Sequence, residues 1–543
     1  MTPVTWKVAI GIALIGPAAG ALSSAAGQVT PRTAADCERL RTLKLENTTI
    51  ALAEQVSGAF SVPGMGDTIR NLPALCRVAG EIQPTADSHI AFEVWLPLER
   101  WNGKLAGIGN GGWAGTISYG GPPNASLADQ VRRGYAAVST NTGHEGNGGD
   151  ARFAYGHPER LVDFAWRAVH EMTVKAKSVT QAFYGRPPAH AYWIGCSTGG
   201  KQGLTEAQRF PTDYDGIIAG APANNWTPLM TATATLSITA IGDSARFLPP
   251  PARALLHDAV MKACDKLDGV EDGVLEDPRR CHFDPAVLQC GATSQTDGSC
   301  LSAAQVGAVR RIYSGVDDPI EARNVSPGLA LGSERLWNPF ATPGRPFPIP
   351  FSFYRWLVFA DSNWDWRSFD LANPRVHQAW IDADRKFTPL LGATDPNLRA
   401  FRAHGGKLIQ YHGWNDPLIT PLNSIHYYES VVAFETRGGR DKASGAADVQ
   451  QFYRLFMVPG MAHCGGGNGP NVFDVEAALE GWVEHGVAPD SVIAAHPGGG
   501  PNGVPDRRRP LCPYPRVAVY KGDGDSNDAA SFSCRDPSMS RRP

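Results

Sequence analysis

Hydrophobic positions in the first half of the chain alternate between strand-like and helix-like patterns. Apolar runs of strand length occupy residues 89–97, 104–108, 135–139, 191–195 and 215–220. Apolar residues recur at helical spacing from Leu161 to Phe183, where Gly185 supplies a stop, and a second helix is expected from Thr198 onward. This order predicts an α/β fold, with a parallel sheet covered by helices.

The pattern changes after Trp226. Residues 227–400 are rich in proline, aspartate, aromatic residues and cysteine, and they predict only scattered helices, one of which opens with a capping box over residues 302–305. Strand patterns resume at residues 407–411 and 452–458, and a last helix is expected over residues 472–485. We therefore predict an α/β domain in two parts, residues 27–226 and 401–543, interrupted by a lid segment, residues 227–400.

The amino-terminal end has the pattern of a secretory signal. An apolar run over residues 8–21 follows a single positive charge, Lys7, and small residues come next, so residues 1–26 are predicted to be a signal peptide. The alternative is an uncleaved anchor, which Gly16 and Pro17 disfavour because they interrupt a run already short for a membrane span. We expect an exported protein, either periplasmic or extracellular.

Charge and cysteine content agree with an exported protein. The 543-residue chain has a net charge of −3, which gives no electrostatic basis for binding nucleic acid or an anionic membrane. Its ten cysteines suggest bridges formed in an oxidising compartment, although sequence alone does not fix their connectivity. Free thiols are the alternative, and zinc is disfavoured because no Cys-x-x-Cys pair occurs. Proximity along the chain suggests Cys37–Cys76, Cys264–Cys281, Cys290–Cys300 and Cys512–Cys534, which leaves Cys196 with Cys464.

A nucleophile-elbow pattern surrounds Ser197. The sequence Gly-Cys-Ser-Thr-Gly, residues 195–199, lies between a predicted strand and a predicted helix. A serine needs a sharp turn to expose its hydroxyl, an adjacent base, an orienting acid and amides that stabilise an oxyanion. The motif also arises by chance in a glycine-rich chain, but its placement favours Ser197 as a nucleophile.

The acid and the base are expected after later strands, in the order serine, acid, histidine. Asp416 follows the strand predicted at residues 407–411, and His463 follows the one at residues 452–458. The alternatives are a turn carboxylate before a proline and a loop histidine beside a structural cysteine. His412 is a rival base, but its position next to the acid favours a hydrogen-bonding role.

Backbone amides for an oxyanion are expected from two places. One is Thr198, directly after the nucleophile, and the other is the glycine-rich segment 109–112, where Gly111 or Gly112 is well placed. Reading the same glycines as a dinucleotide-binding motif is weak, since their spacing is wrong and no ribose-binding acid follows convincingly.

The lid segment contains a short acidic loop with tight glycine turns. Three carboxylates in so short a span would repel one another without a cation, and calcium takes six to eight oxygen ligands. The alternative is a solvated acidic loop, and the similar run at residues 523–528 is read as an ordinary turn. The candidate ligands are Asp265, Asp268 and Asp272, with the carbonyl groups of Val270 and Val274.

At these residues the chain resembles the tannase and feruloyl esterase family of α/β-hydrolases, which also includes mono(2-hydroxyethyl) terephthalate hydrolase. The resemblance spans nearly the whole mature chain and is strongest at residues 193–203, 219–226, 413–417 and 522–534. Members carry a Cys-Ser, Asp, His-Cys signature, matched here by Cys196-Ser197, Asp416 and His463-Cys464. The resemblance implies an α/β-hydrolase fold with an inserted lid, a structural Ca²⁺ at the five candidate ligands, no organic cofactor, and the same five cysteine pairs.

The family cleaves esters of aromatic acids, with the lid forming the acyl pocket. Arg355 is the counterpart expected for the arginine that binds a terephthalate carboxylate, and Phe359 is a candidate for stacking on an aromatic ring. Polar residues beside that arginine are not reproduced, since Ala360 stands there. This favours a feruloyl or galloyl ester, free or attached to plant polysaccharide or polyphenol, over a terephthalate ester.

Three other functions are compatible with the sequence. The first is an esterase for aliphatic acyl groups, and the second is a catalytically silent protein that binds carbohydrate or phenolic compounds on the same fold. The third is a metal-centred hydrolase. An intact Ser197, Asp416 and His463 at matching positions favours the serine esterase.

Overall fold

Nine strands form one mixed sheet in the computed structural model, which describes residues 32–64, 66–121, 125–291, 298–437, 441–496, 498 and 506–537. The strand order is β1-β2-β3-β5-β4-β6-β7-β10-β11, antiparallel from β1 to β5 and parallel from β5 to β11. The bounds are β1 Thr48–Ser61, β2 Thr68–Ile82, β3 Ile90–Pro97, β4 Lys104–Ile108, β5 Ala136–Thr140, β6 His190–Cys196, β7 Gly216–Gly220, β10 Lys407–Gly413 and β11 Tyr453–Val458.

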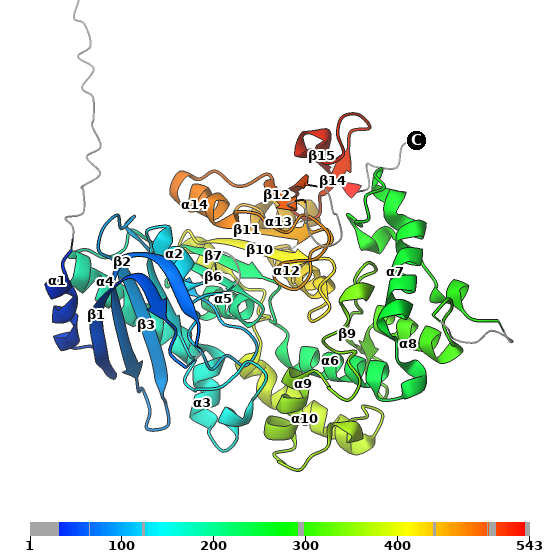
Figure 1. Ribbon diagram of the computed structural model, residues 1–543, viewed down its shortest axis with the longest axis horizontal. Helices are drawn as coiled ribbons and strands as arrows, with labels where there is room; N and C mark the ends of the chain where they lie inside the picture. The colour runs from blue at the N-terminus through cyan, green and yellow to red at the C-terminus, as the bar shows by residue number, and fades with distance from the viewer. Residues whose placement is uncertain are drawn as a thin grey trace, which may run out of the picture.

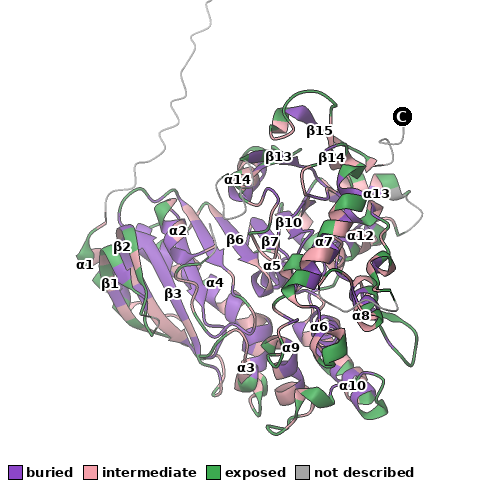
Figure 2. Ribbon diagram, turned by 45° about the vertical axis from the view of Figure 1, so that its right-hand side comes forward, coloured by how far each residue is buried: buried purple, intermediate pink, exposed green. Residues whose placement is uncertain are grey.

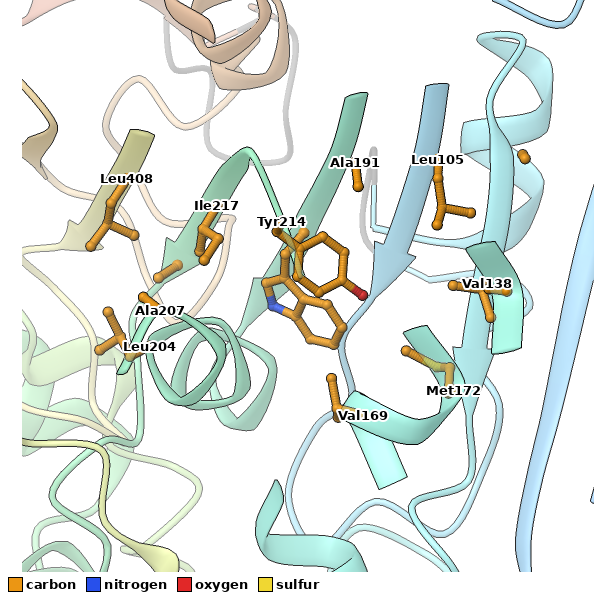
Figure 3. Packing of buried hydrophobic residues seen from close by; sticks show 14 of the residues in the cluster. Leu105, Val138, Val169, Met172, Ala191, Leu204, Ala207, Tyr214, Ile217 and Leu408 are labelled. Atoms are coloured by element: carbon orange, nitrogen blue, oxygen red, sulfur yellow. The ribbon is translucent and has the colours of Figure 1, made fainter. Parts of the chain in front are cut away.

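Helices cover both faces of this sheet, and two hydrophobic clusters show which helix lies on which face. Along β6, Trp193 belongs to the cluster that includes α4 (Ala168–Tyr184), α5 (Thr198–Arg209) and α12 (Pro421–Glu435), whereas Tyr192 belongs to the cluster that includes α2 (Leu127–Arg132) and α14 (Val475–His485). Alternate residues of one strand point to opposite faces, so both faces are buried. Figure 2 shows the central strands buried, and Figure 3 shows Val169 and Met172 of α4 and Leu204 of α5 packed against the sheet.

The predicted α/β-hydrolase fold is therefore correct, and every strand expected in the first half forms within a residue or so of its predicted bounds. The helix expected over residues 161–183 is divided into α3 (Pro158–Val162), a π-helical turn at Asp163–Arg167 and α4, which ends at Gly185 with φ 78°. The long β1–β2 hairpin was not anticipated. Its strands lie at one edge of the sheet and are half exposed, so they lack the continuous apolar runs of the central strands.

Residues 227–400 contribute no strand to the sheet within the described part of the chain, and they are mainly helical. Figure 1 shows them in green and yellow-green beside the sheet. The predicted capping box is present, because Ser302 and Gln305 exchange side-chain to backbone hydrogen bonds. The elements are α6 Trp226–Ile241, α7 Pro250–Cys264, α8 Ala303–Ser314, β8 Val316–Asp317, β9 Asn324–Ser326, α9 Pro348–Phe353 and α10 Pro374–Leu391.

Two small sheets follow the last helix: β12 (Val492–His496) pairs with β13 (Arg507–Leu511), and β14 (Val517–Tyr520) pairs with β15 (Phe532–Arg535). The remaining helices are α1 Ala34–Glu38, α11 Arg399–Ala403 and α13 Lys442–Val449. No helix of the described residues is both long enough and apolar enough to span a bilayer. The predicted signal peptide, residues 1–26, lies outside the described residues.

All ten cysteines are paired as proximity along the chain suggested. The five disulfides are Cys37–Cys76, Cys196–Cys464, Cys264–Cys281, Cys290–Cys300 and Cys512–Cys534. Four of them close short loops, whereas Cys196–Cys464 joins cysteines 268 residues apart. That bridge connects the two halves of the α/β domain on either side of the lid segment.

Candidate active site

Ser197 occupies a sharp turn between β6 and α5. Its backbone has φ 64° and ψ −121°, a region that a residue with a side chain rarely adopts, and it is the N-cap residue of α5. The turn needs glycine at residue 195, because a Cβ there would lie 2.4 Å from the carbonyl oxygen of Gly199. Small residues and a strained backbone therefore present the Ser197 side chain at the carboxyl end of the sheet.

Asp416 and His463 come from the loops that follow β10 and β11. The Asp416 Oδ2 atom lies 2.7 Å from Nδ1 of His463. The other carboxylate oxygen, Oδ1, accepts hydrogen bonds from the amides of Leu418 (2.8 Å) and Ile419 (3.1 Å). The two loops are also joined through the amide of Asn415, which donates to the carbonyl of Met461. Parallel neighbouring strands thus bring together an acid and a histidine that are 47 residues apart.

His412 is buried beside Asp416 and does not line the cavity that contains Ser197. Its Nε2 atom is 3.1 Å from Asp416 Oδ2, its Nδ1 atom is 2.7 Å from the hydroxyl of Ser424, and its side chain is fully buried. Burial alone would raise the pKa of Asp416, but the charge of His463 and the hydrogen bonds from both histidines outweigh it and hold that pKa well below its usual range. Asp416 is therefore an ionised carboxylate that two imidazoles orient.

Ser197 and His463 line the same narrow cavity, which has a volume of about 40 Å³. Gly112 and Thr198 line it as well, and neither of their amides donates to a protein acceptor among the described residues. The Thr198 hydroxyl donates to the carbonyl of Gly112 at 2.7 Å, which ties Gly112 to the turn that carries the serine. Gly111 is not part of the lining, and its carbonyl accepts from Ala114. The geometry thus favours Gly112 over Gly111 as the second oxyanion amide.

The rest of the cavity wall is largely apolar. It comes mostly from α6, from the chain before and within α9, and from the loop after Asp416: Trp226, Leu229, Met230, Phe347, Ile349 and Leu418. The sequence does not distinguish these side chains from core residues, because an apolar residue in a helix has the same local signal whether it lines a cavity or fills a core.

The structure places Arg355 and Phe359 elsewhere. The Arg355 guanidinium donates to the carbonyl of Trp364 at 3.0 Å, and the Phe359 ring stacks on Trp364 with centroids 5.1 Å apart. Neither side chain lines the cavity that contains Ser197. Phe359 packs against the hydrophobic cluster of the lid segment, and Arg355 is hydrogen-bonded within the same segment.

The acidic loop of the lid segment has oxygen atoms suited to a hard cation. The Asp265 carboxylate accepts from the amides of Gly273 (2.9 Å) and Val274 (3.2 Å), and the Asp268 carboxylate accepts from Val270 (3.0 Å). Burial raises the pKa of Asp268 to about 7, and the charge of Asp272 adds to the shift. Crowding and burial disfavour the ionised form of these carboxylates, and a bound Ca²⁺ would stabilise that form.

Two features of this loop were not anticipated. Arg507 and Arg509 of β13 contact Asp272, so the loop is tied to the C-terminal strands. Within the described chain, the three carboxylates do not come within 4.8 Å of one another. Binding a Ca²⁺ ion would therefore require the oxygen atoms to draw closer, with the carbonyls of Val270 and Val274 completing the shell.

Comparisons with known proteins agree with this architecture. A family model described as tannase and feruloyl esterase matches residues 76–535. An uncharacterized esterase of Xanthomonas campestris pv. campestris is 36% identical over 93% of this chain and 92% of its own length. A protein named probable feruloyl esterase B-2 of Aspergillus terreus is 34% identical over 91% of this chain and 93% of its own.

Solved structures give the same result. The crystal structure of feruloyl esterase B from Aspergillus oryzae has a TM-score of 0.83 and 30% identity, covering 92% of this chain and 100% of that one. Tannin acyl hydrolase from Aspergillus niger has a TM-score of 0.76 and 24% identity, covering 94% and 96%, and it supports the fold.

Proposed function

Since the chain belongs to the tannase and feruloyl esterase family and is a carboxylic ester hydrolase, we propose that it cleaves esters of phenolic aromatic acids, such as feruloyl or galloyl esters, with Ser197 as nucleophile. The observation that carries the proposal is the position of His463. It is hydrogen-bonded to Asp416 at 2.7 Å and lines the same cavity as Ser197.

The reaction would proceed through an acyl-enzyme. Nδ1 of His463 faces Asp416, so Nε2 is the nitrogen left to take the proton from Ser197 as Oγ attacks the ester carbonyl. The amides of Gly112 and Thr198 stabilise the oxyanion that forms. The imidazolium then gives its proton to the leaving alcohol, and a water molecule, activated by the same histidine, releases the aromatic acid and restores the Ser197 hydroxyl.

The cavity wall supports a neutral aromatic acyl group. Among the described residues that form it, His463 is the one titratable side chain, and no arginine or lysine is positioned to pair with a second carboxylate. Trp226, Phe347 and Met230 offer the aromatic and sulfur surfaces that favour contact with a ring. A volume of about 40 Å³ holds little more than one water molecule, so an aromatic acyl group requires these side chains to move outward.

We also propose that the lid segment holds a structural Ca²⁺ at Asp265, Asp268, Val270, Asp272 and Val274, and that the protein is exported to the periplasm or the medium. The oxygen donors and the raised pKa of Asp268 support the first proposal. The five disulfides and the signal-like pattern of residues 1–26 support the second. In the proposed reaction the ion has a structural role and takes part in no chemical step.

The test has two parts. Ser197→Ala should lose at least about 10³-fold in kcat on methyl ferulate without a change in thermal stability, and a fluorophosphonate probe should label the wild type but not this variant. The wild type should also prefer methyl ferulate or methyl gallate to mono(2-hydroxyethyl) terephthalate and to a short aliphatic ester. Full activity in Ser197→Ala would refute the mechanism, and a preference for the aliphatic or terephthalate ester would refute the substrate assignment.

A further inference from the structure

Three side chains that bind metals in other proteins meet at the far end of the helix that begins at the nucleophile. They are His170 on α4, Glu206 on α5 and Asp213 in the turn before β7, and their ligand atoms all lie within 4.8 Å of one another. Within the described residues they are the one such group of three or more histidine, cysteine, aspartate or glutamate side chains. Their neighbours Val169, Ala207 and Tyr214 appear in Figure 3 between the helices and the sheet.

Glu206 is a buried carboxylate without a hydrogen-bond donor among the described residues. It is 1% exposed, and neither carboxylate oxygen makes a hydrogen bond with a protein group. Asp213, which is 6% exposed, faces it with a second carboxylate. Two buried carboxylates with so few donors require a positive charge or a shared proton.

The surroundings supply little of that charge. The Lys177 ammonium, whose charge acts on Glu206, donates to the carbonyl of Thr212 at 3.3 Å in an exposed position. The Tyr214 hydroxyl pairs with Thr173 at 2.5 Å. His170 contributes one ring nitrogen, Nδ1, which lies 2.7 Å from Oδ2 of Asp213. Its ring is stacked on Phe210 with centroids 3.8 Å apart, so its orientation is fixed.

We propose that His170, Glu206 and Asp213 bind a divalent transition-metal ion, such as Zn²⁺ or Mn²⁺. One imidazole nitrogen and two carboxylate oxygens form a ligand set that such ions prefer to calcium. Ligands bonded at about 2.0–2.2 Å lie roughly 3 Å apart when they are adjacent in the shell, which is close to the spacing of His170 and Asp213. His170 is partly exposed, so water has access to the remaining coordination positions.

The ion would have a structural role. Glu206 follows Ser197 by nine residues along α5, a rise of roughly 14 Å, so the site lies outside the catalytic cavity. Bound there, the metal joins α4, α5 and the turn before β7 at the end of α5 opposite the nucleophile. Because it binds only the folded chain, it raises the free energy of unfolding by RT ln(1 + c/Kd), where c is the free metal concentration and Kd its dissociation constant.

The experiment measures metal uptake by the full-length mature protein after dialysis against a chelator. Elemental analysis after equilibrium dialysis with Zn²⁺ should give one equivalent in the wild type, accompanied by a rise of several degrees in Tm. Glu206→Gln and His170→Gln should weaken Zn²⁺ binding at least 100-fold. His190→Gln is the matched control, because His190 faces one carboxylate, Asp215, at 4.0 Å, and this variant should bind like the wild type.

A measurement on the wild type alone guards against variants that fail to fold. Co²⁺ bound by one nitrogen and two oxygen atoms should give visible absorption bands that titrate to one equivalent and disappear on adding Zn²⁺. The proposal is overturned if the wild type takes up neither ion, or if Glu206→Gln binds as tightly as the wild type. A further outcome would also overturn it. If the wild type takes up no ion and the Glu206→Gln variant is more stable than the wild type, Glu206 and Asp213 share a proton instead.

Discussion

Cys196 and Cys464 form a disulfide whose two halves directly adjoin Ser197 and His463. The Cα atoms of the bridge are 5.9 Å apart, although 268 residues separate the cysteines in the sequence. The bridge therefore ties the turn after β6 to the loop after β11. We expect this bridge to hold Ser197 and His463 in register as well as to stabilise the fold.

The first prediction concerns this bridge. Replacing both residues, Cys196→Ala plus Cys464→Ala, should lower kcat at least about 10-fold at temperatures where circular dichroism shows a folded protein. The closed loop is long, so the chain-entropy model also predicts a stability loss of roughly 5 kcal/mol.

Cys290→Ala plus Cys300→Ala is the control, because that bridge spans 10 residues in the lid segment. It should cost about 3 kcal/mol in the same model and leave kcat unchanged. Equal kcat values in both double variants would show that the Cys196–Cys464 bridge does not position the catalytic groups.

The second prediction concerns the pair Asp416 and His412. Asp416→Asn keeps the shape of the side chain but removes the charge that orients His463, so kcat should fall about 10³- to 10⁴-fold with little change in KM. His412→Gln removes one of two imidazoles bonded to Asp416 and should cost less, about 10-fold. A larger loss in His412→Gln than in Asp416→Asn would mean that the roles of the two residues have been assigned wrongly.

The third prediction concerns the peptide of Gly112. Thr198→Val removes the hydroxyl that donates to the Gly112 carbonyl and should lower kcat about 10-fold, because the oxyanion amide is then less well oriented. Thr198→Ser retains the hydroxyl and should restore most of the activity. Gly112→Ala should be nearly inactive, since its Cβ would lie 2.2 Å from the carbonyl oxygen of Gly148 at a φ of +54°. Wild-type kcat in Thr198→Val would contradict this role.

The fourth prediction is a pH dependence that originates at Lys201 on α5. Its ammonium donates to the carbonyl of Ala165 at 2.7 Å, and burial lowers its pKa to about 7. In the unfolded chain a lysine titrates near 10.4, so between about pH 7 and pH 10 the unfolded state binds a proton that the folded state has released. Stability should therefore rise with pH across this window, by up to about 5 kcal/mol for the full shift.

Lys201→Met isolates this contribution, because methionine fills a similar volume and does not titrate. The free energy of unfolding of the wild type relative to this variant should increase from pH 7 to pH 10 and stay constant below pH 7. Parallel profiles for the two proteins would show that Lys201 has an ordinary pKa in the folded state.

The fifth prediction concerns calcium. Removing divalent cations with a chelator should lower the Tm by several degrees. Adding Ca²⁺ should restore the part of that loss that comes from the acidic loop of the lid segment, whereas Zn²⁺, which is proposed to bind at His170, Glu206 and Asp213, should not restore that part. Asp268→Asn should abolish the calcium-dependent part. Asp525→Asn is the control, because its carboxylate accepts the amide of Asn527 within an ordinary turn. An Asp268→Asn variant that still responds to Ca²⁺ would place the ion elsewhere.

The sequence by itself predicted the central strands of the sheet, four of the five disulfides and the loops that carry Ser197, Asp416 and His463. Each of these depends on local chemistry: apolar runs of strand length, cysteines close together in the chain, and turn residues with restricted backbone conformations. Each of these signals lies within a few residues of the sequence, so it can be recognised without knowing how the chain packs. The Cys196–Cys464 bridge, which joins cysteines 268 residues apart, followed only as the remaining pair and from the family resemblance.

Tertiary structure alone decided which side chains share a surface. It put Leu229 and Phe347 in the catalytic cavity and packed Arg355 and Phe359 against other lid residues. It also brought His170 to Glu206 and Asp213. The reason is that helices and loops distant in sequence pack by shape. Neither the apolar character of a residue nor its spacing along the chain predicts which distant residue it will contact.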